Sequence, residues 1–168
     1  MAETVTVLTD PLLHSLQQEK LILLSTIDLE TGSPTMNAIS WIYPVDSETL
    51  RFAVDQRSRL IANMQNNALV TLTLIGSGSV HAIYGHAQVA ADTLEGVPFK
   101  LTCFEVKITA VRDAMFYGAR ISVEPEFEKT YDKRAAEKLD NQVFAAMKKS
   151  LGIMPMAFCT QWDITCYL

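Results

Sequence analysis

Apolar residues along the chain follow the two-residue period of β-strands in several short segments. In "TLRFAVD" (49–55), Leu50, Phe52 and Val54 fall on one face, which predicts a strand with one face in the core. "LILLSTI" (21–27) shows little alternation, as expected for a strand that is covered on both faces. Together with the turn residues between the apolar runs, the pattern predicts strands at 21–27, 35–43, 49–55, 68–76, 80–90 and 100–111.

The last of these segments, 100–111, changes the phase of its alternation. Leu101 and Cys103 share one face of the expected strand, whereas Phe104 and Val106 share the other. An extra residue in one strand of a pair produces such a shift. We therefore expect a β-bulge within this strand.

Three further segments carry helix signals. "TDPLLHSLQQEK" (9–20) offers Asp10 as an N-cap and Pro11 at the first helical position. A second helix is expected over 58–67, with Leu60, Ile61 and Met64 turned inward. The clearest helix, 132–151, has apolar residues at spacings of three and four and lysines near its C-terminal end, as the helix dipole favours. Its expected inward residues are Ala136, Leu139, Val143 and Met147.

Six strands joined by short turns, with few helices between them, favour a mainly β fold. A doubly wound α/β fold would need a helix after most strands, and the pattern lacks these helices. We therefore expect an antiparallel barrel with peripheral helices. The 168 residues contain no repeat or linker, so we expect one domain over 1–168, with its core at about 10–150. The apolar tail, 151–168, shows no clear period, and its role stays open.

Charge and cysteine content narrow the possible partners and location. The net charge of −5 gives the chain no general electrostatic reason to bind nucleic acid or an anionic membrane. Cys103, Cys159 and Cys166 lack C-x-x-C spacing, which favours reduced thiols over disulfides. Neither a signal peptide nor an apolar run of about 20 residues is visible. We therefore expect a cytoplasmic protein that binds neither membranes nor nucleic acid.

Two arginines stand where cations are normally disfavoured. "DQRSR" (55–59) joins an expected strand to an expected helix, so Arg57 and Arg59 lie at the positive end of the helix dipole. A bound anion would reverse this effect, and Ser58 could cap the helix beside it. Backbone N–H groups, a hydroxyl and guanidinium groups together suit a phosphate. The alternative is a solvated pair of arginines, each bonded to a nearby carboxylate such as Asp55.

No side chain stands out as an acid, a base or a nucleophile. His81 and His86 are five positions apart in one expected strand, so they lie on opposite faces and cannot share a metal ion. His81 is expected to be a hydrogen-bonded core residue, and no metal site is expected. "GSGS" (76–79) lies between strands and is a turn, not a dinucleotide fingerprint. If the protein catalyses a reaction, a cofactor carries the chemistry.

Three stretches of the sequence together resemble one family of flavoproteins. They are "LILLSTIDLETGSPTMNAISWIY", then "LRFAVD" followed by "QRSRLIANMQNNALVTLTL", and then "GHAQV". In this order they resemble the pyridoxamine 5'-phosphate oxidase-like, FMN-binding split β-barrel proteins over about residues 10–112. The chain is most similar to the small, general-stress-type or uncharacterised members.

The resemblance implies a homodimer of split barrels with one FMN at each of two subunit interfaces. The strand "MNAIS" (36–40) would lie along the isoalloxazine ring. "VDQRSR" (54–59) would approach the ring and then hold the phosphate with Ser58 and Arg59, with Arg57 close by. The implied cofactor-binding residues are Met36, Asn37, Ala38, Ile39, Ser40, Val54, Asp55, Gln56, Arg57, Ser58, Arg59 and Leu60.

The function that the resemblance implies is an FMN-dependent oxidoreductase acting on an unidentified small molecule. Trp162 is present in the tail, but no arginine follows Arg134, unlike the oxidases that act on vitamin B6. Another substrate is therefore expected. Three alternatives stay open: a flavin-binding protein without turnover, a split barrel that uses a deazaflavin, and one that uses haem. The dimer surface is expected to include "WIY" (41–43) and the apolar tail.

Overall fold

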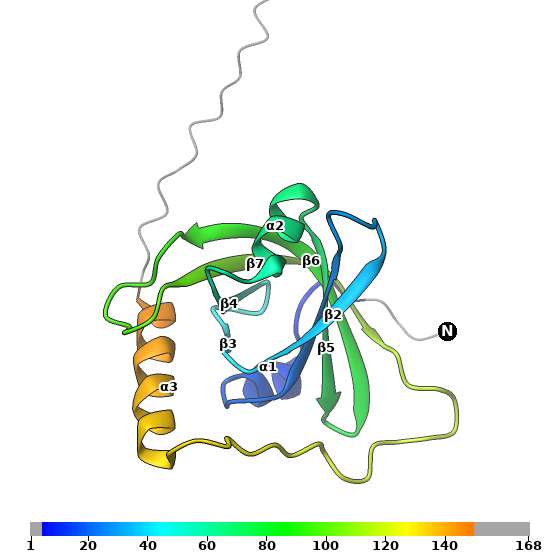
Figure 1. Cartoon of the computed structure of the whole chain (residues 1–168). Helices are drawn as coiled ribbons and strands as arrows, with labels where there is room; N and C mark the ends of the chain where they lie inside the picture. The colour runs from blue at the N-terminus through cyan, green and yellow to red at the C-terminus, as the bar shows by residue number, and fades with distance from the viewer. Residues whose placement is uncertain (1–4, 150–168) are drawn as a thin grey trace, which may run out of the picture.

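The computed structural model describes residues 5–149, and a curled, seven-stranded antiparallel sheet dominates them (Figure 1). The sheet order is β2-β1-β5-β6-β7-β4-β3. The strands are β1 (Ile22–Ile27), β2 (Pro34–Ile39), β3 (Ile42–Pro44), β4 (Thr49–Asp55), β5 (Leu69–Gly76), β6 (Ser79–Ala91) and β7 (Leu101–Asp113). The protein is thus mainly β, a split barrel with flanking helices, as predicted.

The expected strand 35–43 is two strands, which is a correction to the sequence-based prediction. β2 pairs with β1, whereas β3 pairs with β4 at the opposite edge of the sheet. The chain crosses between the two edges at Ser40 and Trp41, where the carbonyl of Trp41 accepts a hydrogen bond from the Ala53 N–H at 3.0 Å. The sequence pattern does not show this break, because Ile42, which follows it, is fully buried in the core and continues the apolar run.

The inside of the barrel is filled by the face predicted for β4. Leu50 and Phe52 are fully buried there, and the Phe52 ring stacks on Phe104 with 5.6 Å between ring centroids. Two helices lie at the openings of the barrel: α1 (Asp10–Leu16) at the lower one and α2 (Arg59–Asn66) at the upper one in Figure 1. α1 starts one residue earlier than predicted, because its N-cap is Thr9, which has an extended backbone. Asp10 is instead in the first turn of the helix, where its negative charge interacts favourably with the positive end of the helix dipole.

The β-bulge expected within the strand 100–111 is present in the pairing of β7 with β6, where Tyr84 pairs with Ala110 and Gly85 with Ile108, so Thr109 is an extra residue of β7. The pairing of β7 with β4 is regular from Thr49↔Lys107 to Asp55↔Leu101. Apolar residues do not keep to one face around Cys103 and Phe104, because both faces of β7 are buried there. The β6–β7 pairing thus has a first register shift after Tyr84, at this bulge, and a second one after Val89. Beside the first shift, a Cβ on Gly85 would lie 2.5 Å from the Lys107 carbonyl oxygen, so the close approach of β6 and β7 requires glycine.

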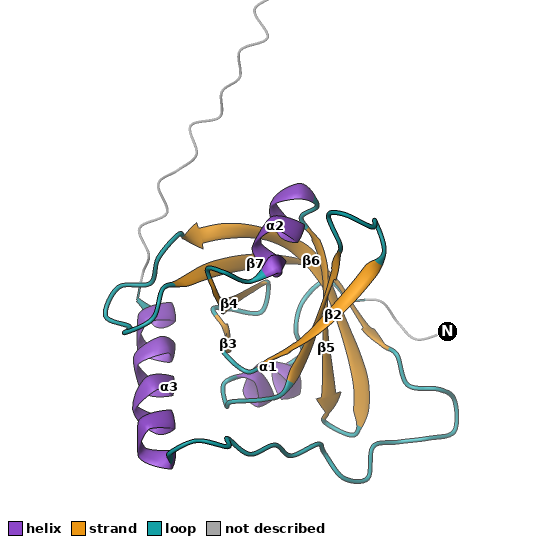
Figure 2. Cartoon of the chain, viewed as in Figure 1, coloured by secondary structure: helices purple, strands orange, loops and turns teal. Residues whose placement is uncertain are grey.

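The third helix, α3 (Lys133–Lys148), packs on the outer surface of the sheet, with Asp132 as its N-cap. A long loop, 114–132, connects the end of β7 to this helix (Figure 2). The buried cluster beneath α3 joins the helix to β4 and β7, and it contains Ala53, Leu94, Leu101, Cys103, Val143, Ala146 and Met147. The predicted apolar face of α3 is therefore confirmed, and Leu139 packs at the edge of the same cluster.

A buried ion pair lies under the C-terminal end of α3. Arg51 on β4 contacts Glu105 on β7 at 3.0 Å, and both side chains are less than a tenth exposed. The Arg51 guanidinium also donates to the carbonyls of Met147 at 3.1 Å and Lys149 at 3.3 Å. A cation thus satisfies the last carbonyls of the helix, where the dipole favours positive charge. Within residues 5–149, no helix is both long enough and apolar enough to cross a lipid bilayer.

Candidate functional site

A pocket of about 380 Å³ lies where the end of β2 meets the junction between β4 and α2. Most of the residues that the sequence assigned to cofactor binding line it: Asn37, Ala38, Ile39, Ser40, Val54, Asp55, Ser58 and Leu60. The structure therefore brings together two segments that the sequence treats separately, 37–40 and 54–60. The other assigned residues, Met36, Gln56, Arg57 and Arg59, do not line this pocket.

Four lining residues were missed by the sequence analysis. Trp41 and Ala53 directly adjoin assigned residues, so extending each segment by one position would have found them. Lys129 and Tyr131 come from the loop 114–132, which has no periodic pattern and lies far away in the sequence. Nothing in their local sequence indicates that they reach the pocket.

The N-terminus of α2 forms one end of the pocket, and Ser58 caps it as predicted. Ser58 has an extended backbone, and its hydroxyl accepts a hydrogen bond from the Leu60 N–H at 3.3 Å. The Ser58 N–H donates to the Asp55 carbonyl at 2.8 Å, which fixes the turn from β4 into the helix. The positive end of the helix dipole is thus directed at this end of the pocket.

Arg57 forms an exposed, bidentate ion pair with Asp55. Its Nε and Nη2 atoms each lie 3.0 Å from one carboxylate oxygen, and the Arg57 side chain is 90% exposed. These hydrogen bonds, with the backbone N–H of Arg57, lower the pKa of Asp55 to about 2. For Arg57, the structure shows the solvated pair that the sequence analysis kept as the alternative.

Arg59 contacts two carboxylates of the turn between β1 and β2. Its Nε lies 2.9 Å from Asp28, and its Nη2 lies 2.8 Å from Glu30. Asp28 is held by N–H groups of its own turn, chiefly that of Thr31, and these hydrogen bonds lower its pKa. The charge of Asp28, followed by that of Glu30, raises the pKa of Arg59. Arg59 thus ties α2 to the β1–β2 turn.

The same turn is held to α2 by a buried amide. Asn63 is almost fully buried, and its side chain accepts from the Leu29 N–H at 3.0 Å and donates to the Thr26 hydroxyl at 3.1 Å. Helical periodicity predicts an inward position here but does not predict a polar residue. The amide lets α2 contact a turn without leaving buried polar groups unpaired.

Two residues of the pocket lining, Trp41 and Lys129, are held by α3. The Trp41 indole N–H donates to Asp140 at 2.8 Å, and Lys129 contacts Asp140 and also lies 2.9 Å from Glu19. Burial opposes the charged form of Lys129, but its hydrogen bonds to Asp140 and Glu19 outweigh this effect and raise its pKa. Trp41 and Tyr43 pack against the α3 cluster, and Ile42 is buried in the core. Trp41 and Tyr43 are nevertheless only half-buried, so the role of "WIY" in a dimer surface stays a prediction, and the tail lies outside the described residues.

The histidines stand apart from this pocket. His86 is exposed on β6, opposite Leu69 of β5. His81 is half-buried, and its Nε2 is buried without a hydrogen-bond partner in the described part of the chain, so the expectation of a hydrogen-bonded core histidine is wrong for this atom. Within residues 5–149 there is no cluster of three or more side chains able to hold a metal ion.

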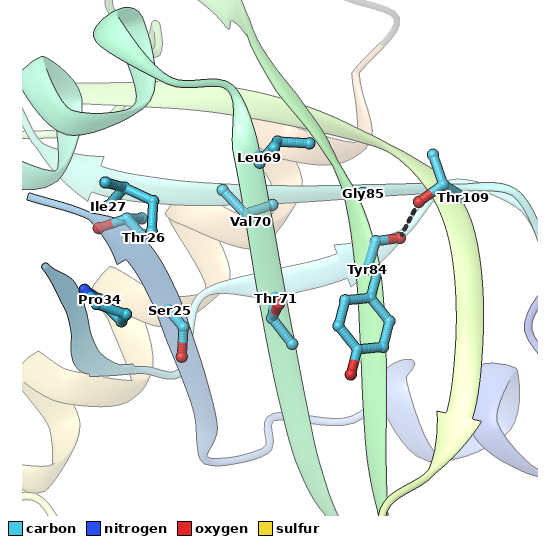
Figure 3. Close-up of a pocket in the computed structure, with 10 residues that line it drawn as sticks. All are labelled: Ser25, Thr26, Ile27, Pro34, Leu69, Val70, Thr71, Tyr84, Gly85 and Thr109. Carbon is cyan, nitrogen blue, oxygen red and sulfur yellow. Dashed lines mark hydrogen bonds between the residues drawn. The ribbon is translucent and has the colours of Figure 1, made fainter. Parts of the chain in front are cut away.

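A second pocket of about 360 Å³ opens on the outer surface of β1, β5 and β6. Ser25, Thr71 and Tyr84 point to the same side of these strands, and the Thr109 hydroxyl donates to the Tyr84 carbonyl at 3.3 Å (Figure 3). No residue assigned to cofactor binding lines this pocket. Met36, one of the assigned residues, pairs with Ser25 in the same row of the sheet and is 60% exposed.

Comparison with known proteins identifies the family. Residues 8–113, more than half of the chain, match the family profile described as pyridoxamine 5'-phosphate oxidase. The chain belongs to the pyridoxamine 5'-phosphate oxidase family. This family segment includes the strands and α2 but ends before Lys129, Tyr131 and α3, which complete the pocket. Among curated proteins, none matches the chain.

Solved structures share the fold of this family member at low sequence identity. A candidate pyridoxamine 5'-phosphate oxidase from Lactobacillus delbrueckii has a TM-score of 0.56 and 18% identity, covering 66% of this chain and 97% of that one. HupZ from Group A Streptococcus has a TM-score of 0.54 and 12% identity, covering 68% and 99%. A protein named F420 reductase has a TM-score of 0.50 and 19% identity, covering 57% and 91%. At these identities the similarity shows the fold alone.

Proposed function

We propose that the chain binds FMN in the pocket between β2, β4 and α2, and acts as a flavin-dependent oxidoreductase on a small molecule. One observation carries this proposal. Residues from the segments 37–41 and 53–60 line one pocket, which has apolar walls and includes Ser58, the N-cap of α2. Membership of the pyridoxamine 5'-phosphate oxidase family supports the same ligand class.

The chemistry of the lining fits an amphipathic, anionic ligand such as FMN. Ile39, Val54 and Leu60 supply apolar wall for a planar ring, and the small side chains of Ala38 and Ala53 leave room beside the backbone. The volume of about 380 Å³ is within the range of small-molecule sites. At the α2 end, the Ser58 hydroxyl, the first-turn N–H groups and the adjacent Arg59 suit a phosphate.

The phosphate would compete with a carboxylate for Arg59. The Arg59 side chain is 55% exposed and Glu30 is 75% exposed, so their contact is surrounded by water and exchanges at small cost. Asp28 is 12% exposed and is held by its own turn, so it stays with Arg59. In the bound protein, Arg59 would keep Asp28 and replace Glu30 with the phosphate.

A bound flavin would supply hydride or electron transfer, and the residues of this chain would bind and orient it. No side chain of the pocket is assigned as an acid, a base or a nucleophile. Vitamin B6 oxidation is not proposed, because no arginine follows Arg134 in the sequence. The substrate is an unidentified small molecule.

We further propose a homodimer, located in the cytoplasm, in which the outer surface of β1, β5 and β6 contacts a second copy. Leu69 and Tyr84 are exposed there, beside the second pocket. A two-fold partner would cover this apolar surface in both copies at once. The buried, unpaired Cys103 agrees with a reducing compartment.

The test is a titration of the purified full chain with FMN, riboflavin, a deazaflavin and haem, followed by absorbance and fluorescence. FMN should bind more tightly than riboflavin, because only FMN carries the phosphate. Consumption of reduced nicotinamide by the loaded protein would separate an oxidoreductase from a flavin-binding protein without turnover. Preference for the deazaflavin or for haem, or no binding of FMN, would overturn the proposal.

A further inference from the structure

We propose that Asp140 is a positioning residue that ties α3 to the candidate pocket and sets its affinity for the ring-bearing part of the ligand. This inference rests on the proposed function for its ligand. It goes beyond the family match, because Asp140 lies outside the matched residues 8–113. It also predicts that the pocket and the docking of α3 are linked.

The geometry places one carboxylate between two walls of the pocket. The Oδ1 atom of Asp140 accepts from the Trp41 indole N–H at 2.8 Å, and the Oδ2 atom pairs with the Lys129 ammonium. Trp41 belongs to the connection between β2 and β3, whereas Lys129 belongs to the loop 114–132, and both line the pocket. Asp140 itself lies on α3 and does not line the pocket.

The contacts of Asp140 are largely shielded from water, so losing them is costly. The Asp140 side chain is 14% exposed, Lys129 is 20% exposed, and Trp41 packs against the cluster beneath α3. Removing the carboxylate would leave an indole N–H and an ammonium short of a partner in a partly buried place, and both groups would move toward water. Lys129 would keep Glu19, at 2.9 Å, so the loop would shift toward the connection between α1 and β1 rather than detach.

Two features separate this role from that of the arginines at α2. Trp41 lies between β2 and β3 and Lys129 lies on the loop 114–132, and neither belongs to the N-terminus of α2 that Ser58 caps, so the effect of Asp140 should not depend on a phosphate. Because coupling between two events is reciprocal, a ligand that orders these walls should also stabilise the docking of α3. Slower amide exchange in α3 on adding FMN is therefore expected.

The binding test compares Asp140→Ala and Asp140→Asn with the wild-type chain, using FMN and riboflavin as probes. Asp140→Ala should weaken both by the same factor, on the order of tenfold, because one charge-assisted contact to each wall is lost. Asp140→Asn should weaken the binding of both ligands less, because its amide oxygen can still accept a hydrogen bond from the Trp41 indole N–H. A matched control is Asn141→Ala, which changes an exposed polar residue of α3 next to Asp140 and does not line the pocket. It should leave both affinities unchanged.

A second readout needs no ligand. In a Trp162→Phe background, Trp41 is the remaining tryptophan, and Asp140→Ala should increase the quenching of its fluorescence by acrylamide, whereas Asn141→Ala should not. If the wild-type protein binds neither flavin, the proposed function is refuted. The acrylamide quenching would still decide whether Asp140 positions Trp41 in the pocket lining. Unchanged quenching in Asp140→Ala, or an equal loss of affinity in Asn141→Ala, would overturn the role of Asp140.

Discussion

The outer surface of the sheet has two halves that differ in how they are covered. The covered half consists of β3, β4 and β7 under α3, where Ala53 is 3% exposed and Cys103 is fully buried. The open half consists of β2, β1, β5 and β6, where Met36 is 60% exposed and Leu69 is 55% exposed. Both halves carry apolar side chains, but within residues 5–149 only the covered half has a helix packed on it.

The difference shows that this fold cannot hide its outer apolar surface with the sheet alone. On the covered half, α3 solves the problem within the subunit, and an ion pair joins Arg51 and Glu105 beneath it. On the open half, Tyr84 is 36% exposed and lines the second pocket, and the guanidinium of Arg112 lies over its ring. We therefore assign the open half to the proposed contact with a second copy. The candidate pocket adjoins the covered half, because Trp41 and Lys129 bond to α3.

The largest effect is expected from breaking the buried ion pair of the covered half. Arg51→Met would leave the Glu105 carboxylate buried without its partner and free two carbonyls at the end of α3. We expect the free energy of unfolding to fall by about 3–5 kcal/mol. Urea unfolding measures this change. The double variant Arg51→Met with Glu105→Leu should recover most of the loss, and a double variant as unstable as the single one would contradict this explanation.

A charge placed on the open half should separate the subunits without unfolding them. Tyr84→Arg would bury a cation in the proposed interface. Removing a hot-spot residue from an interface typically costs about 2–4 kcal/mol of binding free energy. We expect the dimer of the wild type to become a monomer in sedimentation at micromolar concentration. Phe116→Arg is the matched control, since Phe116 is 73% exposed on the loop after β7. A monomeric wild type, or dissociation by both variants, would contradict the contrast between the two halves.

The covered half should also respond to alkaline pH through one thiol. Burial raises the pKa of Cys103 from 9.0 to about 11. Between these values the unfolded chain loses the proton while the folded chain keeps it, so the free energy of unfolding falls as pH rises. Ionisation of Cys103 thus lowers the free energy of unfolding by about 3 kcal/mol across this window and has no effect below it. The stability gap between wild type and Cys103→Ala should therefore narrow from pH 9 to pH 11, and a constant gap would show that Cys103 ionises freely.

Local pattern predicted the parts of the molecule whose neighbours are close in sequence. The alternation in 49–55 identified the inner face of β4, and Ser58 was identified as the cap of α2 because the cap and its helix are adjacent. The run 35–43 was predicted to be one strand because Ile42 is apolar, as expected of a residue inside a single continuous strand. The partners of Arg59 could not be predicted, because only the fold of the β1–β2 turn brings Asp28 and Glu30 to α2.

The same reasoning explains which parts of the candidate site were found. The pocket lining from 37–40 and 54–60 was assigned through the family resemblance, which covers those segments. Lys129 and Tyr131 were missed because they reach the pocket through a long loop that has neither period nor turn signal. Asp140 was missed because helical periodicity assigns polar residues of α3 to solvent, whereas Asp140 bonds to two side chains from other elements.

The central claim is that the N-terminus of α2 and Arg59 hold a phosphate, and Arg59→Ala tests it most directly. The apo forms of wild type, Arg59→Ala and Arg57→Ala are titrated with FMN and with riboflavin. A hydrogen bond to a charged group contributes about 1.5–3 kcal/mol, so Arg59→Ala should bind FMN about 10- to 150-fold more weakly. Riboflavin should bind all three proteins about equally, and Arg57→Ala should keep its FMN affinity because Arg57 pairs with Asp55. An equal loss of FMN and riboflavin in Arg59→Ala, or no loss of FMN, would contradict the account.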